Sequence, residues 1–195
     1  MGKLVSFDNL DNTNTPSKIV LDTNFILNHT NRFTNHPTNK NISDCLNFAK
    51  TLVYANTEIF IPEIVVNEFC CQVYFTILRE YKVKNSLKGS IIEIHKQNPS
   101  IIKSGHEPIK NAIINLDIIR AKRKIAEGGK SVRDKALQLM RKYHLLPSDA
   151  YIGAITIVNQ INNIATLDVP FSKRMLKENV NIYTPFTLIN LLSPT

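Results

Sequence analysis

Short apolar runs alternate along the chain with longer segments in which apolar residues recur at helical spacing. The short runs are rich in β-branched residues and predict buried strands over residues 18–21, 58–61, 163–167 and 180–183. The longer segments predict helices over residues 25–28, 43–54, 63–84, 109–127, 132–143, 147–160, 171–178 and 185–192. Strands that alternate with helices in this way favour a parallel sheet with helices on both faces.

Two stretches lack either pattern. Residues 1–17 are expected to form a flexible N-terminal segment, and the polar residues 30–41, rich in Asn and Thr, are expected to form a loop. The remaining residues, 18–195, are expected to form one domain, because 195 residues with 43% hydrophobic content suffice for a single core.

Cellular location can be predicted from what the chain lacks. Its longest apolar stretches are shorter than the roughly 20 residues of a membrane span, and its first residues do not resemble a signal peptide. The chain has three cysteines, Cys45, Cys70 and Cys71. Three cysteines cannot all pair and these have no CxxC spacing, so a disulfide framework is not expected. These features predict a cytoplasmic protein that does not contact a membrane.

The net charge of +8 is concentrated in one part of the chain. Residues 79–142 carry 16 Lys and Arg against 6 Asp and Glu, whereas the rest of the chain carries 8 against 10. An isolated charge run is usually a solvated helix face, but an imbalance this concentrated favours a polyanionic partner such as nucleic acid.

Four acids occupy positions that a parallel sheet brings to one edge. Asp22 and Asp168 directly follow predicted strands, and Glu68 and Asp149 lie near the starts of helices. Taken singly, each has a structural explanation as a helix cap, a turn residue or an exposed side chain. Packed together, carboxylates repel one another and favour a bound cation, and ligands that are all oxygen select Mg²⁺ or Mn²⁺ over zinc.

The segments around these acids resemble the four signature segments of PIN-domain nucleases. They are IVLDTN at residues 19–24, PEIVVNE at 62–68, LPSDA at 146–150 and ATLDVPF at 165–171. The resemblance implies that Asp22, Glu68, Asp149 and Asp168 bind the metal and catalyse the reaction, with Asn24, Ser148 and Thr166 in support. Val169 and Pro170 depart from the family pattern, in which charged residues often follow the last acid.

The resemblance also implies a fold and an activity. The fold would be a three-layer α/β/α PIN-like domain with a short parallel sheet, to which this chain adds a basic helical insertion around residues 85–142. The activity would be an Mg²⁺- or Mn²⁺-dependent endoribonuclease, in which a metal-activated water hydrolyses phosphodiester bonds and leaves 5′-phosphate and 3′-hydroxyl ends.

The basic segment supplies candidate nucleic-acid contacts on two predicted helices. They are Lys122, Arg123 and Lys124 on the first, and Arg133, Lys135, Arg141 and Lys142 on the second. Such cations give affinity and salt dependence without sequence preference.

Several readings stay open at this point. RNA is the expected substrate, with DNA as an alternative. Two biological roles fit: an RNA-processing enzyme that works with a processing-complex protein, and a toxin held by an antitoxin. A non-cleaving PIN-like RNA-binding module and a homodimer are also open. A receiver-like phosphotransfer domain fits less well, because no acidic pair precedes Asp22 and no suitable lysine follows a later strand.

Overall fold

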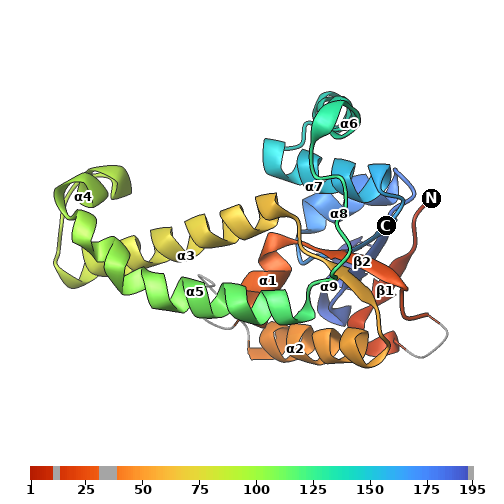
Figure 1. The fold of residues 1–195 in the computed structure, drawn as a ribbon, viewed down its shortest axis with the longest axis horizontal. Helices are drawn as coiled ribbons and strands as arrows, with labels where there is room; N and C mark the ends of the chain where they lie inside the picture. The colour runs from red at the N-terminus through yellow and green to blue at the C-terminus, as the bar shows by residue number, and fades with distance from the viewer. Residues whose placement is uncertain (11–13, 31–38, 193–195) are drawn as a thin grey trace.

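The computed structural model describes residues 1–10, 14–30 and 39–192, which fold around a five-stranded parallel sheet of order β1-β5-β4-β2-β3 (Figure 1). The strands are β1 (Leu4–Ser6), β2 (Lys18–Leu21), β3 (Glu58–Phe60), β4 (Asn163–Ala165) and β5 (Asn181–Thr184). All four strand pairs are parallel. Inner strand β2 buries Ile19, Val20 and Leu21 almost completely, as expected for a strand covered on both faces.

Helices cover both faces of this sheet, which confirms the predicted three-layer α/β/α fold. Figure 1 shows α2 below the sheet, and α7 and α8 above it with α6 outermost. The α-helices are α1 (Thr23–His29), α2 (Asn39–Tyr54), α3 (Glu63–Lys84), α4 (Ile91–Gln97), α5 (Ile102–Ile119), α6 (Gly129–Tyr143), α7 (Pro147–Val158), α8 (Val169–Leu176) and α9 (Phe186–Leu192). Two short 3₁₀ helices, η1 (Phe7–Asn9) and η2 (Pro99–Ile101), complete the described elements. No helix in the described ranges is long and apolar enough to cross a membrane.

The N-terminal residues form part of the sheet, so the prediction of a flexible segment over residues 1–17 is wrong for Leu4–Ser6 and η1. β1 pairs with β5, and the next residue, Phe7, enters the core. The Phe7 ring stacks on Phe48 at a centroid distance of 4.1 Å and meets Phe25 edge to face at 5.7 Å. A three-residue strand is too short to show an alternating pattern, so this strand depends on the contacts that Phe7 and β5 provide.

Helices α3, α4 and α5 project from the sheet as an arm, seen on the left of Figure 1. α3 has 22 residues and is therefore about 33 Å long. A separate hydrophobic cluster of Leu78 on α3, Ile94 on α4 and Ile101 on η2, the short 3₁₀ helix before α5, packs together away from the main core. A reciprocal capping box between Ser90 and Glu93 fixes the start of α4.

The predicted basic insertion over residues 85–142 divides between two places in the fold. α4 and α5 belong to the arm, whereas α6 packs on α7 over the sheet. The arm and the body are joined by residues 120–128, an extended connection that we call the strap.

The strap occupies residues for which the sequence predicts helix, so the predicted helix over 109–127 is wrong at both ends. α5 spans Ile102–Ile119, with Pro108 inside it. After α5, the backbone N–H of Ala121 donates to the carbonyl of Ile59 on edge strand β3 at 2.7 Å. This hydrogen bond to the edge of the sheet outweighs the local preference for helix. The spacing of apolar residues along the sequence does not predict such a bond.

Candidate active site

Asp22 lies where β2 ends and α1 begins, and its side chain is only 5% exposed. Its Oδ1 accepts the backbone N–H of Thr23 at 2.7 Å, and its Oδ2 accepts the hydroxyl of Thr166 at 2.6 Å. The backbone N–H of Asp22 donates to the carbonyl of Ala165 on β4. Asp22 is therefore the N-cap of α1, one of the structural roles expected for a single acid at this position. It is also hydrogen-bonded to the end of the neighbouring strand, β4.

Thr166 connects two of the four predicted acids. Its fully buried hydroxyl donates to Asp22 and accepts the backbone N–H of Asp168 at 3.0 Å. Asn24 reinforces this link, because its Oδ1 accepts the backbone N–H of Leu167 at 2.9 Å. Asp168 itself caps α8, with its Oδ1 accepting the N–H of Phe171 at 2.7 Å. The predicted supporting residues Asn24 and Thr166 thus hold the ends of β2 and β4 together.

Glu68 reaches the same edge of the sheet from the second turn of α3. Its Oε2 accepts the hydroxyl of Thr23 at 2.6 Å. Thr23 was not predicted as a site residue, although its place between Asp22 and Asn24 in the turn after β2 is a signal that could have singled it out. Its backbone contacts one acid and its side chain another.

Asp149 lies half-buried in the first turn of α7, directly after Ser148. Burial is the main cause that raises its pKa to about 6; the negative charges of Asp168 and Glu68 act in the same direction, and the positive charge of Arg174 on α8 opposes them. Arg174 is a second site-proximal residue that the sequence analysis missed.

The four acids interact electrostatically as one group. Burial raises the pKa of Asp22 to about 7 despite the hydrogen bonds from Thr166 and Thr23, and the charges of Asp149 and Glu68 act in the same direction. Asp149 in turn interacts with Asp168 and Glu68. Carboxyl groups that resist ionisation because of burial and like charges are characteristic of functional sites.

The chemistry of this group fits a hard divalent cation. The donors are all oxygens, and a cation offsets both the burial of Asp22 and the repulsion between the acids. In the described ranges, no group of three or more His, Cys, Asp or Glu side chains lies close enough together for all of them to bind one metal ion directly. Mg²⁺ suits such a site, because proteins commonly hold it through one or two carboxylates while it keeps several waters.

Comparison with known families agrees with this geometry. Residues 19–174 of the 195-residue chain match the PIN domain, a span that contains all four acids. The chain belongs to the PIN-domain family. Comparison with curated proteins and with solved structures gives no match. The predicted family and fold are thereby confirmed, and membership supports a nuclease-type function, since PIN domains are generally nucleases that use divalent metal ions.

The cations predicted to bind nucleic acid lie in different settings in this PIN domain. Lys122, Arg123 and Lys124 lie on the strap rather than on a helix, and all three are exposed. Arg133 and Arg141 are exposed on α6.

Lys135 and Lys142, by contrast, form ion pairs with Glu178. Each ammonium group lies 2.7 Å from a carboxyl oxygen of Glu178, and the Tyr143 hydroxyl donates to the same carboxylate at 2.8 Å. Burial opposes the ionisation of Glu178, but these hydrogen bonds outweigh it and lower the pKa of Glu178 to about 2. The two lysines therefore fasten α6 to the residues that follow α8.

Glu178→Gln should destabilise the protein by about 2 kcal/mol, because a carboxylate that accepts charge-assisted hydrogen bonds is lost. Urea unfolding at pH 7 measures this change. The difference between the two proteins should shrink as the pH falls toward 2, where wild-type Glu178 becomes protonated. A variant as stable as the wild type at pH 7 would show that the cluster does not fasten α6.

Proposed function

We propose that this PIN domain is a metal-dependent endonuclease that hydrolyses phosphodiester bonds of single-stranded or structured RNA. The observation that carries the proposal is the buried carboxyl group of Asp22, held between Thr23 and Thr166 and interacting with Asp149 and Glu68. A protein retains a buried acid beside other acids at a cost in stability, which a bound cation offsets.

Asp22, Asp149 and Asp168 would hold the cation, with Glu68 completing the group. A bound Mg²⁺ or Mn²⁺ supplies a water of lowered pKa and neutralises charge on the phosphate oxygens. Thr166 fixes the orientation of the Asp22 carboxyl group, and Thr23 fixes that of Glu68. Glu68, at the edge of the group, is placed to orient a water or to accept its proton. No histidine is required for this chemistry.

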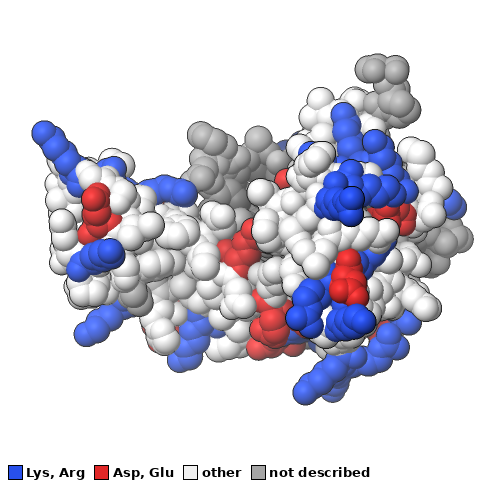
Figure 2. Space-filling model, turned by 90° about the horizontal axis from the view of Figure 1, so that it is seen from above, with Lys and Arg blue, Asp and Glu red and all other residues white. Residues whose placement is uncertain are grey.

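The surface around the acids supports a polyanionic substrate. Figure 2 shows Asp and Glu side chains in the middle of one face, with Lys and Arg side chains on the arm to the left and over the α6 region to the right. Exposed cations of the arm are Arg79, Lys84, Lys88, Lys96, Lys103 and Lys110, and those of α6 that do not pair with Glu178 are Lys130, Arg133 and Arg141. A nucleic-acid strand that crosses this face would meet cations on both sides of the acids, which favour phosphate contacts.

The breadth of this basic surface favours a structured RNA, and so an RNA-processing role over that of a toxin. An antitoxin or processing-complex partner and a homodimer stay predictions. The alternative, an RNA-binding module that does not cut, would use the same basic surface but would not need acids that repel one another.

The proposal is tested with end-labelled single-stranded RNA, a structured RNA and single-stranded DNA, each incubated with Mg²⁺, Mn²⁺ or EDTA. We expect cleavage of RNA with either metal, products with 5′-phosphate ends and no cleavage in EDTA. Cleavage that persists in EDTA would contradict the metal role. Intact RNA in every condition, together with tight RNA binding, would favour the non-cleaving module.

A further inference from the structure

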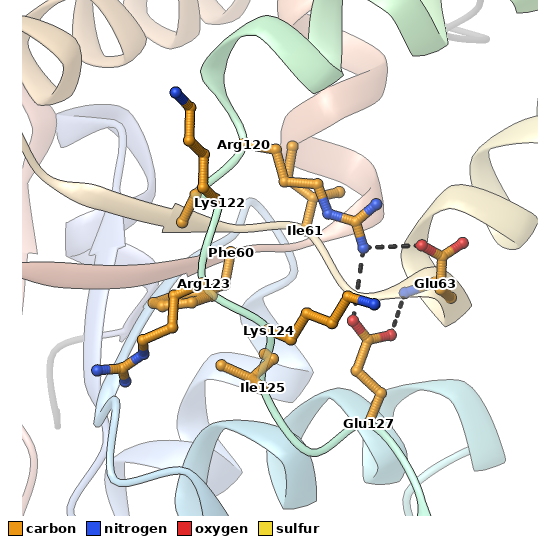
Figure 3. A pocket seen from close by; sticks show the side chains of 10 residues that line it. Phe60, Ile61, Glu63, Arg120, Lys122, Arg123, Lys124, Ile125 and Glu127 are labelled. Atoms are coloured by element: carbon orange, nitrogen blue, oxygen red, sulfur yellow. Dashed lines mark hydrogen bonds and ion pairs between the residues drawn. The ribbon is translucent and has the colours of Figure 1, made fainter.

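A pocket of about 450 Å³ lies between the strap and the end of β3, apart from the four acids (Figure 3). Phe60 and Ile61 line it from β3 and the residue after it, Glu63 lines it from the start of α3, and strap residues form the rest. The strap residues are Arg120, Ala121, Lys122, Arg123, Lys124, Ile125 and Glu127. The pocket thus combines an apolar floor with a charged rim.

At one end of the rim, Arg120 forms ion pairs with two acids, so this group carries a net charge of −1. Arg120 lies 2.8 Å from Glu63 and 3.4 Å from Glu127, and Glu127 also accepts the backbone N–H of Glu63 at 2.5 Å. Figure 3 shows these three residues grouped on one side of the pocket. They bind the strap to the start of α3 and so give the pocket a fixed wall.

The rest of the rim is cationic. In the described part of the chain, no carboxylate lies within ion-pairing distance of Lys122, Arg123 or Lys124. In Figure 3, Lys122 and Arg123 extend away from the ion-pair group, whereas Lys124 extends across the pocket toward it. The guanidinium of Arg123 lies over the Phe60 ring at 5.9 Å from its centroid. Phe60 thereby orients a planar cation whose other face can stack on an unpaired base.

The pocket and the acids are joined through α3. Glu63 lines the pocket and Glu68 belongs to the acidic group, so the two are about 7.5 Å apart along the helix axis. They are also about 140° apart around that axis, so the pocket opens on another side of the same helix start. A strand that contacts both has to curve around the start of α3.

We infer that this pocket is a nucleic-acid subsite, which takes one nucleotide of a single-stranded RNA segment near the cleaved bond. Lys122 and Lys124 hold its phosphates, and its base stacks on Arg123. The volume suits one nucleotide, since ligand pockets range from about 300 to 1,000 Å³. The inference rests on the proposed function, to which it adds a place where the strand is held outside the acids.

The test is the fluorescence anisotropy of a labelled oligouridylate 12-mer in EDTA, over a series of salt concentrations. Lys122→Gln with Lys124→Gln should weaken binding about tenfold and reduce the slope of log affinity against log salt by about 1.4, the value for two phosphate contacts on a single strand. The matched control removes two exposed lysines of α2, Lys40→Gln with Lys50→Gln, and should bind like the wild type.

A third variant tests the stacking contact. Arg123→Lys keeps the charge but removes the planar group, and should weaken binding about threefold or more. Unchanged affinity in this variant overturns the stacking role. Equal affinity and salt dependence in the Lys122/Lys124 variant and its control overturn the subsite itself, and would leave the pocket to a partner other than RNA.

These outcomes are separate from those of the proposed function, because EDTA removes the metal and the assay measures binding alone. A wild-type protein that binds the oligomer but cuts nothing with metal refutes the endonuclease and not the subsite. A Lys122/Lys124 variant that binds as tightly as the wild type refutes the subsite even if cleavage is confirmed.

Discussion

Asp22→Asn should lower the rate of RNA cleavage about a thousandfold while the protein stays folded. The change removes one negative charge from a site that is proposed to hold a divalent cation, and a thousandfold loss corresponds to about 4 kcal/mol of transition-state stabilisation. The amide oxygen of Asn can still accept the Thr166 hydroxyl, so the contact with the end of β4 is retained.

This effect is measured under single-turnover conditions with Mn²⁺, beside the control Asp117→Asn, which changes an exposed acid on α5. The control should cut like the wild type. Isothermal titration calorimetry should show weaker Mn²⁺ binding in the Asp22 variant only. Cleavage by Asp22→Asn at the wild-type rate would remove this carboxyl group from the mechanism.

The metal-free protein should be less stable at pH 8 than at pH 5. The pKa of Asp22 is raised from 3.8 to about 7 in the fold, so between these values the folded state holds a proton that the unfolded state releases. Stability contributed by the protonated group is therefore complete below about pH 4 and is lost as the pH rises through 7. From this carboxyl group we expect a loss of about 2 to 3 kcal/mol between pH 5 and pH 8, or roughly 5 to 10 °C in Tm.

Thermal unfolding in EDTA at several pH values measures this loss, with Asp22→Asn as the control. The variant lacks the ionisable group, so it should be more stable than the wild type at pH 8 and differ little at pH 5. The difference between the two proteins reports Asp22 together with its coupling to Asp149, because Asp149, whose pKa is raised to about 6, and His29, whose pKa is lowered by burial, titrate in both. Mg²⁺ at pH 8 should raise the wild-type Tm by preferring the ionised, folded form. Parallel curves for the two proteins would contradict the raised pKa.

The sequence predicts the central sheet and the acids because both depend on local patterns. The buried run at β2 and the acid that follows it require only β-branched residues and a change to a helix. The same holds for β4 and Asp168. Parallel strands then place these residues at one edge without further information, which explains why the four acids could be predicted to lie near one another.

The elements that the sequence analysis missed depend on contacts between distant segments. β1 forms because it pairs with β5 and because the next residue, Phe7, stacks on Phe48. The strap is not helical because the backbone N–H of Ala121 donates to the carbonyl of Ile59. The interaction of Lys135 and Lys142 with Glu178 likewise joins residues about 40 positions apart. The sequence analysis predicted that these lysines bind phosphate, because the number of charges along a chain does not show which of them form ion pairs.

The hydrogen bond between the strap and β3 also has a bearing on how this PIN domain can associate with other chains. An exposed final strand invites an incoming peptide to extend the sheet through main-chain pairing. In this PIN domain the edge strand β3 has only three residues, and the strap already forms a backbone hydrogen bond to it where an incoming peptide would pair. Recognition on this flank must therefore be by side chains, which distinguish one partner from another more sharply than a bare backbone does.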